Sequence, residues 1–455
     1  MAQKTNLDSK YADLKKLLDS DDIKKFRKNF LDMHFYDQSQ FFLQLDKPDR
    51  LRIYELIEPD VTADMFDTIE DDLPEFPEFL QEMDVQYAAD MLDNMYDDNA
   101  ADVLEHLDKT EVDKYLSKMP RSEANNLRGL LHYDTETAGG LMTTDYVSFD
   151  VSQTIGQAMK YLKEEAEDAE TINSLFVVDE NDDLMGVLSL RELVINNNNA
   201  KLGNVMNTHI ISVDVDADQT EVAQVFRDYD FLTVPVVDHA HHMVGIITVD
   251  DVIEIIDDEA QSDYSGLAGV DVEESITDNP FKSASKRLPW LITLLFLGMI
   301  TATLIGHFEN LLSEASILAV FITLITGTAG NAGTQSLAVA VRRLALVNDD
   351  EHKLRSIILR ETLTGLLTGL ITGGTIFVVV GFWQHSFILG FVIGLAMMAA
   401  ITVANLAGTL IPIIMDKFGF DPAVASGPFI STLSDLTSVL IYFNIANFFI
   451  GFFMK

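Results

Sequence analysis

The chain has 455 residues, with 31 Lys and Arg against 72 Asp and Glu, a formal net charge of −41 at pH 7. Residues 288–455 hold only 7 of the basic and 9 of the acidic residues, so residues 1–287 carry a net charge of −39. This acidic half excludes nucleic acid as a partner, since its recognition needs Lys and Arg, and the absence of cysteine excludes disulfides and thiolate metal sites. The N-terminus has no apolar h-region, so we predict no signal peptide and a cytosolic acidic half.

Residues 10–119 read as a series of short amphipathic helices. The segment DVQYAADMLDNM at residues 84–95 is followed at once by the similar segment YDDNAADVLEHL at residues 96–107. A twelve-residue unit accommodates one short helix and its turn, so neighbouring units must pack together to bury their apolar faces. We therefore predict an all-α, solenoid-like N domain over residues 1–135, of either hand.

From residue 142 the pattern changes to alternating strands and helices, and it does so twice. SLFVVDE and LMGVLSLREL in the first unit correspond to LTVPVVD and MVGIITVDDVI in the second, with helices predicted at residues 154–167 and 219–229. Each unit reads as β-α-β-β-α with a Gly turn between strands. The duplicated units, over residues 136–200 and 201–257, resemble a tandem α/β CBS pair, a module that often binds adenosyl ligands.

The resemblance implies a nucleotide site in the second unit. GIITVDD, at residues 245–251, is similar to the CBS ending whose Thr and Asp contact ribose and phosphate, which carries over to Thr248 and Asp251. ATP is the nucleotide that this resemblance suggests. The first unit has SLRE at residues 189–192 instead and departs from the pattern.

Residues 258–286 are expected to form a connecting helix, and residues 287–455 an all-α membrane domain. Five apolar stretches there are each long enough to cross a hydrocarbon core of about 30 Å at about 1.5 Å per residue. Small residues four apart, as in Gly365-x3-Gly369-x3-Gly373, predict close helix packing. The stretches are residues 288–307, 317–341, 357–383, 387–415 and 428–453.

Lys and Arg in the short loops predict the orientation of the spans. Basic residues precede the first span and lie in the loops after the second and fourth spans, whereas residues 307–316 and 383–386 contain none. The acidic half is therefore expected on the cytoplasmic side of the cell membrane and the C-terminus outside.

Two polar features lie inside the spans. The second span contains TGTAGNAGTQS at residues 326–336, and its three glycines at three-residue spacing are expected to break the helix. Polar, glycine-rich backbone at that depth is tolerated only inside protein or beside water. The residues concerned are Gly327, Gly330, Gly333, Asn331, Thr334 and Gln335.

The fifth span carries Asp435 within STLSDLTS, which we interpret as the only ionisable residue well inside any span. A carboxylate at that depth costs about 2.5–3.5 kcal/mol on insertion scales and usually faces a pathway or a partner. A protonated Asp shared between helices is the alternative. With hydroxyl, amide and carbonyl oxygens nearby and no thiolate or imidazole in the core, the chemistry favours a hard cation such as Mg2+.

The order of these parts resembles the MgtE magnesium transporters over essentially the whole chain. The resemblance rests on TAGGLMTTDYVSF at residues 137–149, the CBS pair, GTAGNAGTQSLAV and DPAVASGPFISTLSD. Members of this family are homodimeric Mg2+ channels, with a pore between protomers lined by the second and fifth spans. The family's pore aspartate falls on Asp435, and by carry-over Gly330, Asn331, Thr334 and Ser431 would surround a largely hydrated ion.

Some relatives have Asn where Thr334 and Gly427 stand, so the ligand set is expected to differ in detail. In the family, Mg2+ bridging acidic residues closes the cytosolic domains, and the connecting helix then blocks the pore. Asp251 falls at both the nucleotide site and this Mg2+ cluster, and the sequence leaves its role open. The matching positions are Asp98, Asp102, Asp218, Asp230, Asp251, Glu254, Glu259 and Asp263.

Two other classes of protein remain alternatives. A proton- or sodium-coupled transporter would titrate Asp435 during its cycle, although five spans do not divide into inverted repeats. A membrane enzyme or nucleotide-sensing receptor lacks support, because no Walker loop or nucleophile–base pair is present, and we expect no enzymatic activity. His239, His241 and His242 form a loop cluster that we interpret as a solvated turn, with weak metal binding as the lesser alternative.

Overall fold

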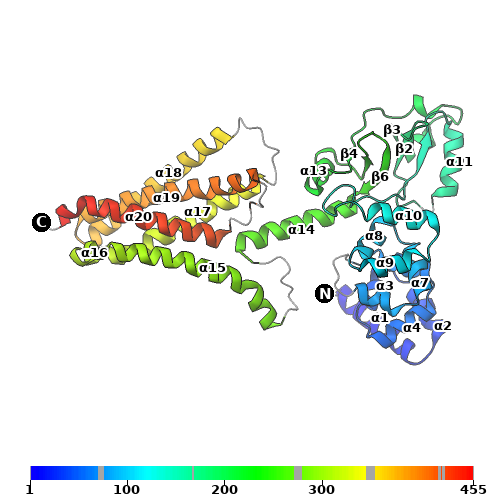
Figure 1. The fold of residues 1–455 in the computed structure, drawn as a ribbon, viewed down its shortest axis with the longest axis horizontal. Helices are drawn as coiled ribbons and strands as arrows, with labels where there is room; N and C mark the ends of the chain where they lie inside the picture. Colours follow the sequence, from blue (N-terminus) through cyan, green and yellow to red (C-terminus); the bar gives the residue numbers. More distant parts are fainter. Residues whose placement is uncertain are drawn as a thin grey trace. The chain divides into compact units, whose positions relative to one another are not determined.

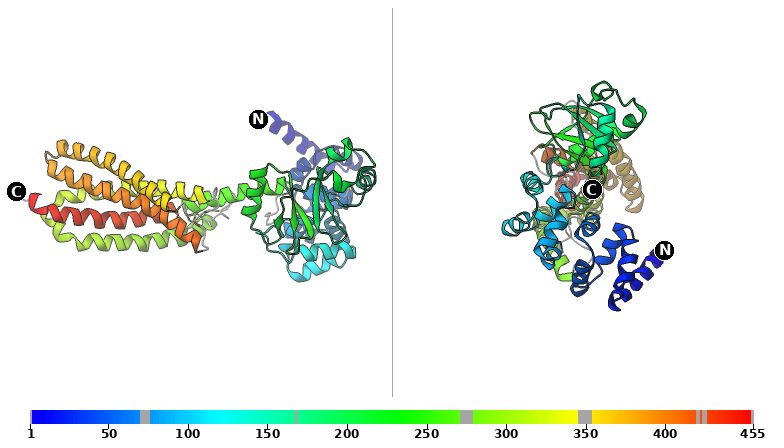
Figure 2. Two further views of the ribbon diagram at one scale, coloured as in Figure 1. Left: turned by 90° about the horizontal axis from the view of Figure 1, so that it is seen from above. Right: turned by 90° about the vertical axis from the view of Figure 1, so that its right-hand side faces the viewer.

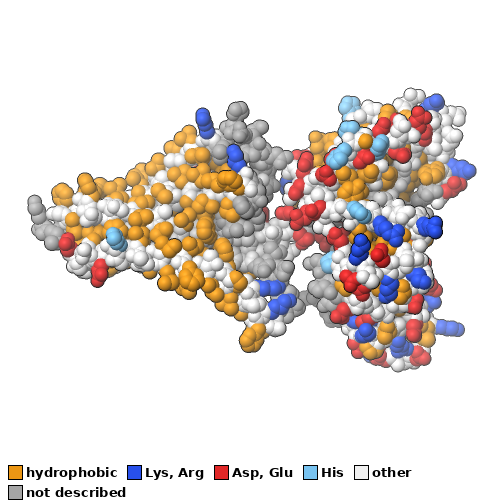
Figure 3. All heavy atoms as spheres, viewed as in Figure 1, with side chains coloured by type: hydrophobic (Ala, Val, Ile, Leu, Met, Phe, Trp, Pro, Cys, Tyr) orange, Lys and Arg blue, Asp and Glu red, His pale blue; other side chains and the backbone are white. Residues whose placement is uncertain are grey.

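The computed structural model describes residues 2–69, 76–166, 169–270, 279–344, 354–418, 422 and 426–453. The chain forms two compact units, residues 1–256 and 257–455, and each is described by itself. Hydrophobic side chains dominate the visible face of the second unit, whereas charged side chains are numerous on that of the first and lie among hydrophobic and other atoms (Figure 3). This difference matches the charge asymmetry of the sequence.

The N-terminal domain of the first unit consists of short helices, as predicted. The twelve-residue period extends beyond the two repeats visible in the sequence, because α3, α4 and α5 begin twelve residues apart, as do α7, α8, α9 and α10. The helices are α1 (Ala2–Asp19), α2 (Ile23–Leu31), α3 (Phe35–Phe42), α4 (Lys47–Leu56), α5 (Pro59–Phe66), α6 (Phe76–Glu82), α7 (Val85–Leu92), α8 (Asp97–Glu105), α9 (Lys109–Leu116) and α10 (Arg121–Leu130).

Each period consists of about two helical turns followed by a tight turn that begins the next helix. Asp84 caps α7 by accepting a hydrogen bond from the Gln86 N–H, and Asp108 caps α9 in the same way. Helices two apart in the chain pack together, as α3 does with α5, α5 with α7, and α8 with α10. The predicted stacked helical architecture is therefore confirmed (Figure 1).

The two β-α-β-β-α units that follow are closely similar, which confirms the predicted duplication. In each, the first strand pairs in parallel with the second, and the second pairs antiparallel with the third. Asp182 and His241 occupy equivalent turns, both with positive φ. The first unit contains β1 (Ser148–Asp150), α11 (Ile155–Glu165), β2 (Ser174–Val178), β3 (Leu184–Ser189) and α12 (Leu190–Ile195); the second contains β4 (Val213–Asp214), α13 (Gln219–Tyr229), β5 (Thr233–Val237), β6 (Met243–Thr248) and α14 (Val249–Ala268).

A short 3-10 helix, η1 (Leu202–Asn204), lies between the two α/β units. The expected connecting helix, residues 258–286, falls on the second part of α14 and the first residues of α15, while residues 271–278 lie outside the described part of the chain.

The second unit contains five helices long and apolar enough to cross a membrane, as predicted. They run side by side (Figures 1 and 2), with α19 packed against α17, α18 and α20, and α15 packed against α20. The elements are α15 (Pro280–His307), α16 (Glu309–Glu314), the 3-10 helix η2 (Ser316–Phe321), α17 (Ile322–Leu344), α18 (Leu354–Trp383), α19 (Phe387–Lys417) and α20 (Gly427–Phe453).

Glycines bring the backbones of these helices together, as predicted for α18 and α19. A Cβ atom added to Gly369 would lie 2.7 Å from the Met398 carbonyl oxygen, and Gly373 faces Gly394. Side chains at such positions would separate the helices and remove van der Waals contact.

The predicted break in the second span is wrong. α17 is one continuous α-helix from Ile322 to Leu344, and the irregular 3-10 segment η2 precedes it. The glycines serve packing instead: a Cβ on Gly333 would lie 2.9 Å from the Ser434 hydroxyl and 3.3 Å from the Ala404 carbonyl oxygen. Contacts with α19 and α20 stabilise the helix against the conformational freedom of its glycines.

Candidate functional sites

An acidic cavity of about 440 Å³ lies in the first unit, between the N-terminal helices and the α/β pair. Its lining contains six carboxylates and, among the residues that the structure describes, no Lys or Arg. These carboxylates belong to Asp67, Asp98, Glu170, Asp250, Asp251 and Glu254.

Helix ends place several of these side chains. Asp98 lies in the first turn of α8 and is only 6% exposed; its carboxylate accepts a hydrogen bond from the Asn99 N–H at 2.9 Å. Asp251 lies in the first turn of α14 and accepts from the Thr248 N–H at 3.2 Å and the Thr248 hydroxyl at 2.8 Å. Glu170 lies in the connection between α11 and β2. Three separate segments thus converge on one cavity.

Burial without a nearby cation disfavours ionisation of these carboxyls. Burial, followed by the negative charge of Asp251, raises the pKa of Glu170 to about 8, and the same two causes raise the pKa of Asp98 well above its ordinary value. Burial raises the pKa of Asp251 to about 6 and that of Asp67 to about 7. No Lys or Arg in the described lining offsets the charge of these carboxylates, and a bound cation would do so.

The donor set fits a hard divalent ion. Oxygens of Glu170, Asp250 and Asp251 all lie within 4.8 Å of one another. The Oε2 atom of Glu170 is buried and has no hydrogen-bond partner in the described part of the chain. An all-oxygen set of carboxylates, with neither imidazole nor thiolate, suits Mg2+ rather than a softer metal.

The structure brings together half of the predicted cytosolic sensing residues. Asp98, Asp251 and Glu254 line the acidic cavity, as does Thr248 of the expected nucleotide site. Asp102 lies one turn after Asp98 on α8, and burial, followed by the charge of neighbouring carboxylates, raises its pKa to about 7. The nucleotide and sensing residues thus share one location.

The other predicted sensing residues lie elsewhere. Asp218 and Asp230 flank the two ends of α13, about 17 Å apart at about 1.5 Å per residue, and neither lines the acidic cavity. Asp218 caps α13 by accepting a hydrogen bond from the Thr220 N–H at 2.9 Å. Glu259 and Asp263 lie on the part of α14 that belongs to the second unit.

Sequence reasoning missed Glu170 and Asp67. Neither belongs to a recognisable motif. Each reaches the cavity only through packing of segments that are distant in the sequence, so local patterns do not reveal it. Asp250 was visible beside Asp251 in the DD pair after β6, but the sequence offered no reason to add it to the set.

In the second unit, α17 and α20 contact each other through small and polar residues. A Cβ on Gly330 would lie 2.8 Å from the Ser431 hydroxyl, and the Thr334 methyl group lies 3.6 Å from where a Cβ on Gly427 would be. Asn331 is exposed on the surface of α17 within this single chain. Of the predicted pore residues, Gly330, Thr334 and Ser431 therefore lie along the contact between these two helices, whereas Asn331 lies outside it.

Asp435 follows Ser431 by four residues and shares its face of α20. Its side chain is half-buried, and within the described residues it has neither a hydrogen bond nor an ion pair. The nearby hydroxyls of Ser434 and Ser438 are also buried without a described partner. Unpaired polar groups at this depth indicate a ligand or a water-filled pathway.

Glu361 is a second carboxylate within the predicted spans, but it lies only seven residues from the start of α18, so the prediction that Asp435 alone lies well inside a span stays a prediction. Glu361 of α18 is 7% exposed, lies 3.7 Å from Arg343 of α17, and accepts a hydrogen bond from the Ser336 hydroxyl at 3.4 Å. The predicted stretch of residues 357–383 already contains Glu361, but its ion pair with Arg343 depends on packing between helices that the sequence does not reveal.

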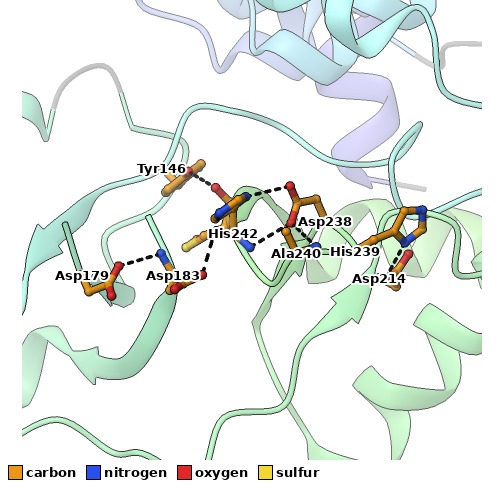
Figure 4. A network of polar contacts seen from close by, with 9 residues as sticks. Tyr146, Asp179, Asp183, Asp214, Asp238, His239, Ala240 and His242 are labelled. Carbon is orange, nitrogen blue, oxygen red and sulfur yellow. Dashed lines mark hydrogen bonds and ion pairs between the residues drawn. The ribbon is translucent and has the colours of Figure 1, made fainter. Parts of the chain in front are cut away.

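The histidine cluster lies in the turn between β5 and β6 (Figure 4). The two ring nitrogens of His239 lie 3.2 Å from carboxylate oxygens of Asp214 and Asp216, and His242 lies 3.0 Å from Asp238. These carboxylates raise the pKa of both histidines. His239 is exposed and His242 is partly exposed, as expected of a solvated turn. Asp214, Asp216 and His239 each offer one ligand atom within 4.8 Å of the others, so weak metal binding, the lesser alternative, stays a prediction.

Comparison with known proteins covers most of the chain. A family model described as a divalent cation transporter matches residues 322–445, the MgtE intracellular N domain matches residues 33–136, and the CBS domain matches residues 138–196 and 202–258. The magnesium transporter MgtE of Enterococcus faecalis is 58% identical over 454 residues, covering 100% of both chains. That of Bacillus subtilis is 36% identical over 434 residues, covering 95% of this chain and 96% of its own.

Two solved structures resemble the first unit. The soluble part of a magnesium transporter is 47% identical, with a TM-score of 0.54, and covers 56% of this chain and 99% of its own. The cytosolic domain of the Mg2+ channel MgtE in complex with ATP is 30% identical, with a TM-score of 0.51, and covers 54% of this chain and 99% of its own. With full-length relatives, matching domains and five apolar helices, the chain belongs to the MgtE family of membrane-embedded magnesium transporters.

Proposed function

We propose that the protein is a channel that passes hydrated Mg2+ down its electrochemical gradient, through a pore formed by two copies of the chain. The observation that carries this proposal is the unpaired carboxylate of Asp435 on the α20 face that contacts α17. A two-fold axis beside this face would bring two such carboxylates to one divalent ion and neutralise its charge.

Retention of the first water shell avoids most of the dehydration cost of Mg2+, which demands near-ideal octahedral geometry. Asp435 would then act on the ion's water ligands, helped by the hydroxyls of Ser431 and Thr334, the Asn331 amide and the backbone of Gly330. Selectivity would follow from the size of the hydrated complex.

The test is Mg2+ uptake into proteoliposomes at neutral and acid external pH. Asp435→Asn removes the charge at nearly constant size, and Glu314→Gln, at an exposed carboxylate of the same unit, is the matched control. We expect uptake that needs Asp435, survives Glu314→Gln, follows the Mg2+ gradient and ignores a proton gradient. Uptake driven by protons or sodium would instead establish a coupled transporter, and wild-type uptake by Asp435→Asn would refute the pore assignment.

We further propose that intracellular Mg2+ closes the channel by binding the acidic residues of the cytosolic region. The acidic cavity supports this, since its described lining contains six carboxylates and no Lys or Arg, so a divalent ion could bridge carboxylates from separate segments. Asp98, Asp102, Asp251 and Glu254 are the proposed sensing residues there. The family resemblance adds Asp218, Asp230, Glu259 and Asp263.

ATP binding is proposed at the same place. A relative's cytosolic domain has been crystallised with ATP, and Thr248 and Asp251 line the acidic cavity here. Since the phosphates are anionic and the cavity is acidic, ATP would need Mg2+ as its counter-ion. We place the first unit in the cytoplasm and the C-terminus outside, because Lys and Arg gather in the loops after the second and fourth spans.

A further inference from the structure

A second cavity, of about 290 Å³, lies between α17, α18 and α19 in the membrane unit. None of the residues assigned to the pore lines it. Most of its wall is apolar, whereas one end holds two arginines and one glutamate. The residues that line it are Val339, Ala340, Arg343, Leu344, Ser356, Ile357, Arg360, Glu361, Thr409 and Ile413.

The charges at the polar end do not balance. Glu361 pairs with Arg343 at 3.7 Å, and the Ser336 hydroxyl lies within hydrogen-bond distance of both Glu361 and Thr409. Arg360 is exposed and forms no ion pair within the ranges that the structure describes. Within the described residues, one positive charge thus remains at a cavity whose wall is otherwise mostly apolar and includes the hydroxyl groups of Ser356 and Thr409.

The depth of this end corresponds to the lipid headgroups. α18 has 30 residues, or about 45 Å at about 1.5 Å per residue, against a hydrocarbon core of about 30 Å. Arg360 lies about 10 Å from the start of α18, so its guanidinium can reach the interface. Val339, which borders the cavity, is 47% exposed on the outer surface of the helices, where acyl chains would run.

We propose that this cavity binds an anionic phospholipid from the adjacent leaflet. Arg360 and Arg343 hold its phosphate, because guanidinium groups match phosphate oxygens in geometry and charge. One acyl chain packs along Val339, Ile357 and Ile413. Basic pockets between transmembrane helices are suited to lipid headgroups in this way, and the proposal is independent of whether the protein is a channel or a coupled transporter.

The test is native mass spectrometry of the full-length protein with phosphatidylglycerol or phosphatidylcholine. Arg360→Gln removes the unpaired charge, and Arg342→Gln removes an exposed arginine of α17 that does not line the cavity. We expect wild type and Arg342→Gln to retain phosphatidylglycerol equally. Arg360→Gln should bind it about fivefold more weakly, the factor for one basic group at about 1 kcal/mol. Retention of secondary structure by circular dichroism shows that each variant is folded.

Equal phosphatidylglycerol binding by all three proteins would overturn the proposal, as would displacement of the lipid by inorganic phosphate alone. The chain has no cysteine, so Val339→Cys provides a single thiol at the rim of the cavity. High-yield disulfide crosslinking of two copies through this thiol would also overturn the proposal, because a second protein chain would then cover the cavity. Labelling of the thiol by a lipid-soluble maleimide that phosphatidylglycerol slows would support it.

Discussion

Replacement of Glu170 by Gln tests the acidic cavity at the residue that the sequence did not reveal. The substitution removes one charge at nearly constant shape, and the Oε2 atom of Glu170 has no described partner to lose. We expect the substitution to make the metal-free protein more stable and to reduce the further stabilisation that Mg2+ causes.

The magnitude follows from the pKa of Glu170. Burial and the charge of Asp251 raise it from 4.5 to about 8, so at pH 7 the group is protonated in the folded protein and ionised in the unfolded chain. The carboxyl group must therefore take up a proton when the chain folds. Because pH 7 lies about 2.5 units above its ordinary pKa, this protonation costs about 3 kcal/mol, at about 1.36 kcal/mol per unit. Gln avoids this cost, and relaxation of the cavity makes 3 kcal/mol an upper bound.

The assay is thermal unfolding of residues 1–268, followed by circular dichroism at pH 7 with a chelator or with Mg2+. The soluble part of a 47% identical transporter has been crystallised alone, which supports the use of such a fragment. We expect Glu170→Gln to raise the Tm by about 5–10 °C without metal, since about 1 kcal/mol corresponds to about 2–4 °C at this size. The further increase caused by Mg2+ should be smaller than in wild type.

Glu180→Gln is the matched control, because Glu180 is an exposed carboxylate of the same α/β unit. It should leave both melting temperatures within about 1 °C of wild type, as exposed substitutions do. If Glu170→Gln lowered the metal-free Tm, or left the Mg2+ response at its wild-type size, the argument from unpaired buried charge would be wrong.

Two further predictions concern pH and packing. The folded pKa values of Asp67, Asp102 and Glu170 lie above their ordinary values, at about 7, 7 and 8. Their contribution to the free energy of unfolding is therefore fully present below about pH 4 and is lost as pH rises to about 8. Since Mg2+ binds the ionised carboxylates, calorimetry should show tighter Mg2+ binding, with release of protons, over the upper part of this range. In α17, Gly330→Ala places a methyl group 2.8 Å from the Ser431 hydroxyl and should slow Mg2+ uptake at least several-fold, whereas Gly327→Ala meets nothing within 4 Å and should not. Equal uptake by the two variants would contradict the close α17–α20 contact.

The sequence was sufficient for the architecture because each element carries a local pattern. Periodic apolar residues with capping aspartates such as Asp84 and Asp108 predict the short helices, and two similar β-α-β-β-α segments predict the duplicated domain. Runs of more than twenty apolar residues leave no alternative to spanning helices. These patterns depend on neighbours in the sequence, so tertiary structure was not needed to interpret them.

The same reasoning failed where packing decides the outcome. Gly327, Gly330 and Gly333 favour a broken helix when considered alone, yet α17 is continuous because α19 and α20 pack against it. Glu361 was not singled out, although Arg343 from the neighbouring helix pairs with it and makes its burial tolerable. In both cases the outcome depends on neighbouring helices and not on the residue's own segment.

The family resemblance predicted that acidic residues sense Mg2+, and the structure indicates which of these residues are suited to that role. An exposed carboxylate remains hydrated, and dissolved salt screens its charge. Binding of Mg2+ to such a group therefore releases little free energy. Asp108, for example, serves as an exposed helix cap, whereas Asp98 is 6% exposed in a cavity without a described basic residue. Ionisation of the buried carboxyls in the acidic cavity is unfavourable without a cation, and binding of Mg2+ can offset this cost. Sensitivity to Mg2+ should therefore depend mainly on the carboxylates of the acidic cavity rather than on the net charge of −39, and substitution of exposed acids that are not proposed sensing residues, such as Glu180, should leave it unchanged.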